Sequence, residues 1–168
     1  MKHTPDLLND TALIHFEDRQ KAIPLALSVA QSAKRQICIM GRDIDRPLFD
    51  TVEFVECIRQ LALSSPRAQI KILAQKTKGN VKSGHRIIPL SQQLSSLIHV
   101  RTPDIQHSNI QNILILADDF AYLKCPKANY YQGTACFYDR LEVRHLQSKF
   151  DDIWSHATVD MSIRRLHL

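Results

Sequence analysis

The stretch that decides the fold runs from Asn112 to Trp154 and begins NILILADDFAYLK at 112–124. Its apolar run at 113–117 predicts a buried strand, and Asp118-Asp119 predicts a turn into a second strand over 120–123. The segment GTACF follows at 133–137, and then a helix over about 139–157 that contains FDDIW at 150–154. We expect the large apolar residues of that helix to pack it against the sheet.

Strand and helix alternate three times upstream of this stretch. An edge strand is expected over 11–16, and Asp18 has the character of a helix N-cap before an apolar pattern of helical spacing. Further strands are predicted at 36–40, 68–74 and 98–100, and further helices at 51–63 and 85–94. The alternation predicts an α/β fold, with a mixed, largely parallel sheet flanked by helices. We expect one domain over 11–157, an N-terminal arm over 1–10 and a C-terminal tail over 158–168.

Composition and size indicate an ordinary globular domain. The chain has 168 residues, of which 44% are hydrophobic and 23% charged. Its apolar runs of about five or six residues are too short to span a bilayer, and its first residues lack the apolar core of a signal peptide. We therefore expect a cytoplasmic protein without membrane contact.

The cysteines favour neither a disulfide framework nor a metal site. The chain has four, and they form no C-x-x-C pair and no series of short spacings. They are Cys38, Cys57, Cys125 and Cys136. Cys38 and Cys57 lie in apolar patterns and are expected to be small buried hydrophobes. No cofactor is expected.

The net charge of +5 favours an anionic partner, and charged loops follow two of the predicted strands. Ligands of open α/β sheets bind beyond the carboxyl ends of the strands. Arg42 opens the first of these loops, RDIDRP at 42–47. It could bind a phosphate or carboxylate through both arms of its guanidinium, or it could pair with Asp43 or Asp45 and only shape the loop.

The second charged loop, over 76–86, contains GNVKSG at 79–84 with the spacing of a Walker phosphate loop. His85 and Arg86 stand where that loop needs lysine and serine or threonine, so a magnesium-nucleotide site is not expected. A simpler anion site at the start of the following helix, with Lys82, His85 and Arg86, stays open. The alternative is a basic loop that only faces water. His107 could converge with these residues or simply be solvated.

The order of elements over 113–154 resembles the C-terminal half of a catalytic unit of the phospholipase D-like superfamily. That family carries a His-x-Lys-x4-Asp pattern, in which histidine attacks phosphorus and lysine stabilises the phosphate charge. Counted back from Asp118, the histidine position is Gln111 and the lysine position is Ile113. Gly133-Thr134 is similar to the family's Gly-Ser/Thr step, which implies that Thr134 lies near a bound phosphate. The resemblance implies a single-half form without the catalytic pair, and homodimers that join two half-sites.

The loop at 42–45 and the step Gly84-His85-Arg86 also resemble an uncharacterised bacterial domain found beside or fused to acetyltransferases. This second resemblance implies an accessory role with an acetyltransferase as partner. We predict a non-catalytic binding or regulatory module whose degenerate phosphodiester site binds nucleic acid or another phosphate-bearing ligand. Its anion-binding residues are predicted to be Arg42, Lys82, His85, Arg86, His107 and Thr134. The alternatives are a divergent phosphodiesterase that uses His85 or His107, and a pure protein-interaction partner of an acetyltransferase.

Overall fold

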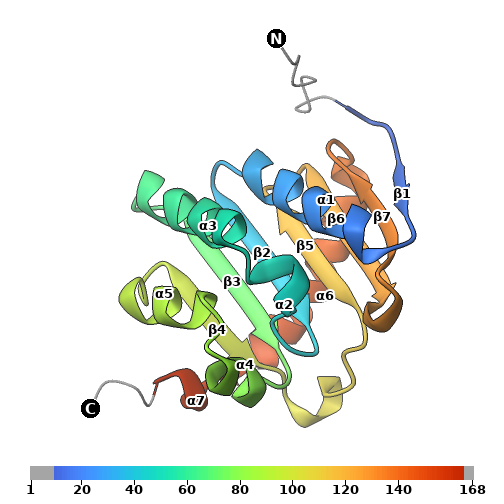
Figure 1. Cartoon of the computed structure of the whole chain (residues 1–168). Helices are drawn as coiled ribbons and strands as arrows, with labels where there is room; N and C mark the ends of the chain where they lie inside the picture. Colours follow the sequence, from blue (N-terminus) through green and yellow to red (C-terminus); the bar gives the residue numbers. More distant parts are fainter. Residues whose placement is uncertain (1–9, 165–168) are drawn as a thin grey trace.

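The computed structural model of the chain describes residues 10–164, which form a sheet of eight strands flanked by helices (Figure 1). Across the sheet the strands lie in the order β1-β7-β6-β5-β2-β3-β4-β8. In chain order they are β1 (Ile14–Phe16), β2 (Gln36–Gly41), β3 (Gln69–Ala74), β4 (Ile98–Thr102), β5 (Ile113–Ala117), β6 (Ala121–Lys127), β7 (Gln132–Cys136) and β8 (Thr158–Val159).

The predicted α/β class, with a mixed sheet between helices, is confirmed. Of the seven strand pairs, β2–β3 and β3–β4 are parallel, and the other five are antiparallel. The expectation that the sheet is largely parallel is wrong, because β5 enters beside β2 from the opposite direction, and two successive hairpins then add β6 and β7.

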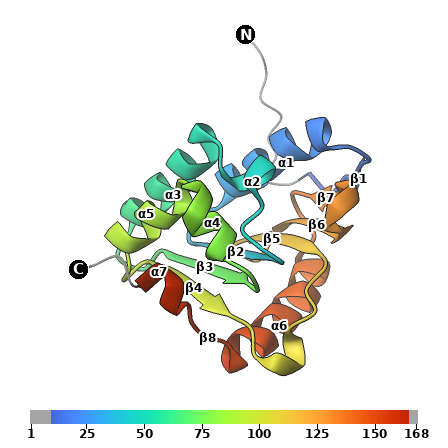
Figure 2. The same cartoon turned by 60° about the horizontal axis from the view of Figure 1, so that its bottom comes forward.

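Helices cover the two faces of the sheet unequally. They are α1 (Arg19–Ser32), α2 (Arg46–Phe49), α3 (Val52–Ser64), α4 (Lys78–Ser83), α5 (Ile87–Gln93), α6 (Arg140–His156) and α7 (Met161–Arg164). Helices α1, α3 and α5 lie on one face, and α6 lies on the other (Figure 2). The predicted N-cap is confirmed, because the Asp18 carboxylate accepts a hydrogen bond from the backbone N–H of Lys21 at 2.9 Å.

The apolar run of β5 is continuous because both faces of this strand are buried. Ile113 and Ile115 belong to the larger core beneath α1, α3 and α5. Leu114 and Leu116 belong to the second core, where Phe150 of α6 packs. This arrangement fits the prediction that α6 packs against the sheet.

The turn after β5 connects the end of this strand to the start of its neighbour β2. Asp118 has a left-handed φ of 52°, and its carboxylate accepts hydrogen bonds from the backbone N–H groups of Lys34, Arg35 and Gln36 at 2.8–2.9 Å. The predicted hairpin turn is therefore present, and Asp118 has a structural role at the opposite end of β5 from Gln111.

Two segments hold more structure than their sequence indicates. The charged loop predicted over 76–86 contains the helix α4, and the tail predicted from 158 contains β8 and α7. The predicted arm, apart from residue 10, and the last four residues of the predicted tail lie outside the described residues. Among the helices that the structure describes, none has the length and apolar character needed to cross a membrane.

Candidate functional site

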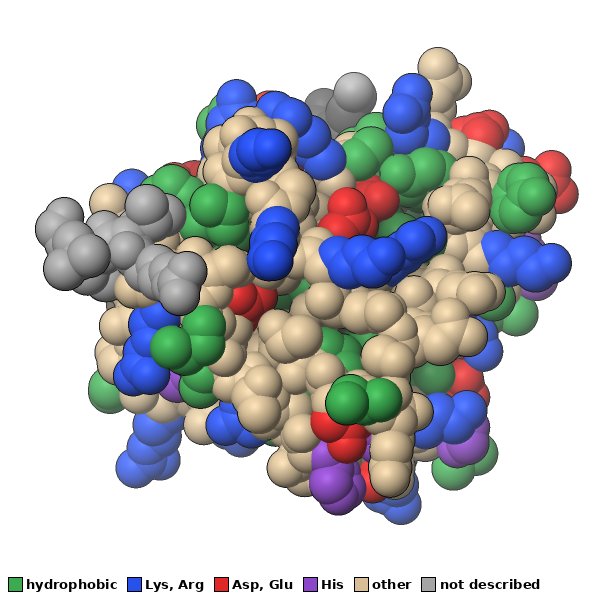
Figure 3. All heavy atoms as spheres, turned by 90° about the horizontal axis from the view of Figure 1, so that it is seen from below, with side chains coloured by type: hydrophobic (Ala, Val, Ile, Leu, Met, Phe, Trp, Pro, Cys, Tyr) green, Lys and Arg blue, Asp and Glu red, His purple; other side chains and the backbone are tan. Residues whose placement is uncertain are grey.

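One edge of the sheet collects the loops that the sequence singled out. The carboxyl ends of β2, β3 and β4 lie there together with the start of β5 and the end of β6, as the antiparallel registers require. The connection from β4 to β5 passes the carboxyl end of β3, where the backbone N–H of Ile110 donates to the Gln75 side chain at 3.1 Å. We call this region, made of the loops 42–51, 75–86, 103–112 and 126–131, the loop edge (Figure 3).

Arg42 lies exposed at the loop edge without an ion pair inside the described region. Asp45 is buried and engaged elsewhere. Its carboxylate accepts the Tyr131 hydroxyl at 2.9 Å and the backbone N–H of Leu48 at 3.1 Å. Burial raises the pKa of this carboxyl, although both hydrogen bonds oppose the shift. Of the two alternatives for Arg42, these contacts favour an arginine that is available to a ligand.

The Walker-like segment is a short helix whose asparagine braces the neighbouring loop. Asn80 is buried, accepts a hydrogen bond from the backbone N–H of Ile44 at 3.0 Å and donates to the carbonyl of Ile44 at 2.9 Å. Gly84 ends the helix with a left-handed φ of 72°, which glycine adopts without strain. The segment therefore does not form a phosphate loop, and it presents Lys78 and Lys82 to solvent.

An internal carboxylate occupies the start of α5, where an external anion was predicted. Asp50 accepts a hydrogen bond from the backbone N–H of Arg86 at 2.9 Å, and the Arg86 guanidinium donates to the carbonyl of Asp50 at 2.9 Å. The Arg46 guanidinium lies 3.0 Å from the other carboxylate oxygen. Burial raises the pKa of Asp50, but the Arg86 hydrogen bonds and the nearby positive charges outweigh it and leave the pKa lowered.

His85 is fully buried beside Asp50, with 3.8 Å between its Nδ1 and the carboxylate. Burial lowers its pKa more than Asp50 raises it, so the ring is neutral near pH 7. Nδ1 accepts the backbone N–H of Ile87 at 3.2 Å, which places the remaining proton on Nε2. Among the described residues Nε2 has no hydrogen-bond partner of good geometry, although the Asp45 carbonyl lies near enough to affect the pKa. A substrate at the surface does not reach this ring.

His107 belongs to a separate group at the end of α6. Its Nδ1 lies 2.6 Å from Asp104, its Nε2 lies 3.7 Å from Asp152, and its ring stacks on His156. The hydrogen bond from His107 lowers the pKa of Asp104. No hydrogen bond or ion pair within residues 10–164 joins this group to His85 or Arg86, so these histidines do not form one site.

The row of side chains across β5, β6 and β7 lacks the catalytic pair of the resembled family. Ile113 is 2% exposed in the larger core, and Gln111 is exposed at the loop edge. On the α6 face, Lys124 pairs with Leu114 and Thr134 in register and contacts Glu142 at 2.9 Å. The Thr134 hydroxyl is enclosed and lacks a partner of good geometry among the described residues, although the Tyr122 hydroxyl lies near it.

Five exposed cations of the loop edge make no ion pair with any described carboxylate. They are Arg42, Lys76, Lys78, Lys82 and Lys127. Figure 3 shows Lys and Arg side chains along the upper half of this face and, beside histidine, at its lower right. Lys76, Lys78, Lys124 and Lys127 lie outside the set of residues predicted to bind an anion. Lys124 could have been noticed as a cation within an apolar strand, whereas nothing local indicates that Lys127 reaches this edge.

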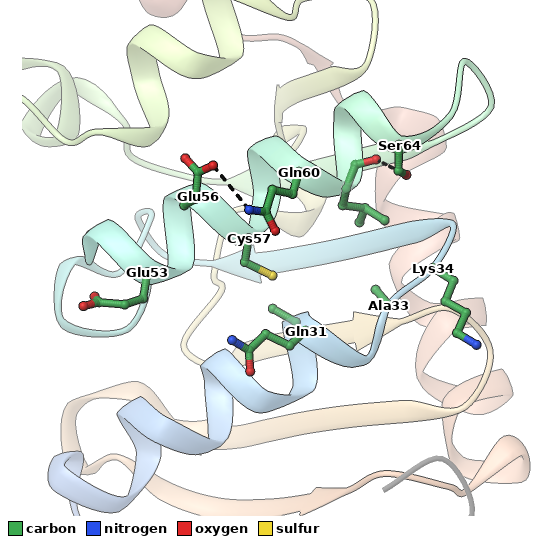
Figure 4. A pocket seen from close by; sticks show the side chains of 10 residues that line it. Gln31, Ala33, Lys34, Glu53, Glu56, Cys57, Gln60 and Ser64 are labelled. Atoms are coloured by element: carbon green, nitrogen blue, oxygen red, sulfur yellow. Dashed lines mark hydrogen bonds between the residues drawn. The ribbon is translucent and has the colours of Figure 1, made fainter. Parts of the chain in front are cut away.

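A groove of about 570 Å³ lies away from the loop edge, between α1 and α3 (Figure 4). Cys57 points into it towards Gln31, and Glu53, Glu56 and Lys34 stand at its rim. Burial raises the pKa of the Cys57 thiol to about 11, which keeps it protonated at neutral pH. This groove therefore offers neither a nucleophile nor a concentration of positive charge.

The strand order, the helices on both faces and the loops gathered beyond the strand ends define a phospholipase D-like α/β fold. The chain belongs to the family described as Domain of unknown function (DUF7931), whose model matches residues 18–166. A comparison with curated proteins found no match.

Several solved structures share the fold. TrmBL2, an archaeal chromatin protein, is 11% identical with a TM-score of 0.66; the match covers 95% of this chain and 57% of that protein. Nuc from Salmonella typhimurium, a phospholipase D family member, is 18% identical with a TM-score of 0.61, covering 89% of this chain and 97% of Nuc. NucT from Helicobacter pylori is 11% identical with a TM-score of 0.58, covering 89% of this chain and 98% of NucT. At these identities the likeness concerns the fold alone.

Proposed function

We propose that this chain is a non-catalytic module that binds phosphate-bearing ligands, nucleic acid foremost, through the exposed cations of the loop edge. The observation that carries the proposal is that Arg42 and four lysines lie together at this edge without a carboxylate partner among the described residues. Unpaired surface cations exchange their counterions for phosphates, which is the main source of affinity for a nucleic-acid backbone. Asp43 is the exposed acidic residue that lies closest to them in the sequence.

The residues at the catalytic positions of the phospholipase D-like superfamily support binding without turnover. Gln111 replaces the nucleophilic histidine, and an amide nitrogen is not a usable nucleophile at neutral pH. Ile113 replaces the lysine and offers no charge to a phosphoryl group. A phosphodiester bound at this edge would therefore contact neither the histidine nor the lysine that phospholipase D-like enzymes use for cleavage.

Four of the six predicted site residues have one of two roles in this proposal, and His107 and Thr134, whose hydroxyl is enclosed, have neither. Arg42 and Lys82 contact the ligand directly, since both are exposed and free of ion pairs with described residues. Arg86 and His85 maintain the loop edge through Asp50, with the half-exposed Arg86 guanidinium free to add a further contact. We assign no ligand contact to His107, because carboxylates flank both of its ring nitrogens.

The neighbours in fold space support the choice of ligand class. The structure of TrmBL2 is described as showing a novel mode of DNA binding, and Nuc is described as a phospholipase D family member. Because this chain spans 57% of the length of TrmBL2, we take from it only the class of ligand to be tested.

Binding of labelled nucleic acid, followed by fluorescence anisotropy between about 50 and 200 mM salt, tests the proposal. We expect Arg42→Ala and Lys82→Ala each to weaken binding and to reduce the log–log salt slope by about 1. Arg35→Ala is the matched control, since Arg35 is an exposed arginine at the opposite end of β2 and its loss changes net charge equally. Equal effects of Arg42→Ala and Arg35→Ala, or no binding at low salt, would refute the proposal.

Four further predictions come from the resemblances or from the histidines. Homodimer formation is checked by sedimentation equilibrium, and an acetyltransferase partner by co-purification from the native host. A divergent phosphodiesterase would hydrolyse a generic phosphodiester, and His85→Ala or His107→Ala would abolish that turnover. An interaction role without anion binding would leave partner capture unchanged in Arg42→Ala.

A further inference from the structure

The loop between β6 and β7 presents an exposed aromatic ring beside the cations of the loop edge. Tyr130 is 63% exposed, whereas both neighbouring segments are fixed. The backbone N–H of Ala128 donates to the Gln111 carbonyl at 3.0 Å. Tyr131, with a left-handed φ of 49°, donates its hydroxyl to Asp45 at 2.9 Å. The anchors at Ala128 and Tyr131 thus place Tyr130 at the surface.

A pocket of about 440 Å³ adjoins this loop between the start of β5, the end of β6 and α6. Its volume is within the range of about 300–1,000 Å³ typical of small-molecule sites. Its lining combines three amide side chains, Asn109, Gln111 and Asn112, with the cations Lys124 and Lys149. Glu142 pairs with Lys124, while Lys149 is exposed and makes no ion pair with a described residue.

We propose that the loop edge is selective for single-stranded nucleic acid, with one base stacked on Tyr130 and an adjacent nucleotide in the amide-lined pocket. This inference rests on the proposed function, because it names the ligand of that same edge. Aromatic rings stack on any unpaired base, whereas the bases of a duplex are stacked on one another and turned away from the surface. Gln111 donates one amide N–H to Asn109 at 3.3 Å and keeps a second N–H and its carbonyl oxygen. These groups and the amide of Asn112 suit the edges of unpaired bases without fixing one sequence.

The cations complete the path of the strand. The hydrogen bond from the Tyr131 hydroxyl to Asp45 ties the segment that carries Tyr130 to the loop that carries Arg42, and Lys127 directly precedes that segment. Exposed cations and an exposed aromatic ring at the same edge of the sheet match the two components of single-strand binding, phosphate neutralisation and base stacking. Lys149 supplies a phosphate contact at the pocket itself.

The test compares a labelled oligothymidylate of about 16 nucleotides with a mixed-sequence duplex of the same length, in the full chain. We expect the wild-type protein to bind the single strand about tenfold more tightly than the duplex. Tyr130→Leu, which keeps apolar area but removes the ring, should weaken single-strand binding about tenfold and leave duplex binding unchanged. Tyr130→Phe keeps the ring and should retain the affinity. Gln111→Leu should weaken single-strand binding as well, because it removes one amide of the pocket.

The outcomes distinguish selectivity for single strands from the anion binding proposed for the loop edge. Equal affinity for duplex and single strand, together with an unaffected Tyr130→Leu, would overturn the inference and leave the anion-binding proposal standing. Absence of binding to either polymer would overturn both. Since the side chain of Tyr130 is exposed, its replacement leaves the core untouched, and circular dichroism of each variant checks that the fold is retained.

Discussion

The Asp50→Asn substitution tests whether an internal carboxylate secures the loop edge. The Asp50 side chain is 2% exposed and accepts the backbone N–H of Arg86, while the guanidinium groups of Arg46 and Arg86 lie at 3.0 and 3.3 Å from its oxygens. Asparagine keeps the shape and one acceptor, so the backbone hydrogen bond survives as a neutral bond. Its amide NH₂ then faces the donor group of Arg46, which must turn towards solvent.

The expected loss follows from these contacts. Weakening the charge-assisted bond to the buried N–H costs about 1 kcal/mol. The side chains of Arg46 and Arg86 are 58% and 54% exposed, so solvent screening limits each ion pair to about 0.5 kcal/mol. Release from burying a charge offsets part of this sum. We expect Asp50→Asn to lower the free energy of unfolding by about 1–2 kcal/mol at pH 7, measured by urea denaturation followed by circular dichroism.

The pH dependence gives the sharper check. Because the folded-state pKa of Asp50 is lowered, its ionised form contributes stability above the unfolded-state pKa of about 3.9, and this contribution is lost as pH falls through the folded-state value. The difference between wild type and Asp50→Asn should therefore be constant at neutral pH and shrink in the acidic range below about pH 4. A variant as stable as the wild type at pH 7, or a difference that does not shrink on acidification, would show that the carboxylate does not have this role.

Three further predictions address the brace, the sheet and the thiols. Asn80→Ala leaves two backbone groups of the 42–45 loop without their partner, so we expect a loss of about 2–4 kcal/mol in urea denaturation and weaker anion binding; unchanged stability would contradict the brace. Gly133→Ala places a Cβ 2.0 Å from a backbone carbonyl of β6 and should prevent stable folding, whereas Gly79→Ala meets no atom within 4 Å and should be neutral or slightly stabilising; similar melting temperatures for both would refute this. Cys57, with its pKa raised to about 11, should react slowly with a thiol reagent at pH 8 and quickly after unfolding in urea; equal rates in both states would contradict the raised pKa.

The parts of the fold that sequence could predict are those with a local cause. Three features each favour one local conformation, and neighbouring residues favour the same one. They are the apolar run at 113–117, the alternation around Ile70 and Ile72, and the N-cap at Asp18. The two-residue strand β8 has no such cause, because it exists through pairing with Arg101 and Thr102. Local sequence does not predict the helix α4 either, because it has six residues and one of them is glycine, which disfavours a helix.

The contacts that shape the candidate site join residues far apart in sequence. Asn80 and Ile44 are 36 positions apart, as are Arg86 and Asp50. The Thr77 hydroxyl donates to Asp160 across 83 positions and ties the α4 segment to the C-terminal part of the described chain. A one-dimensional pattern shows that a loop is basic, but it does not show which of its cations the fold supplies with a carboxylate.

Arg42 and Arg86 illustrate this difference, since both follow predicted strands in charged loops and looked equivalent in the sequence. The fold brings Asp50 to Arg86 and occupies its backbone N–H, while the aspartates near Arg42 leave it unpaired in the described structure. The same reasoning applies to the missing catalytic pair. Ile113 packs in the larger core at 2% exposure, so a lysine there would bury an ammonium group among apolar side chains. Packing as well as sequence thus agrees with the proposal that the loop edge binds a phosphate-bearing ligand without cleaving it.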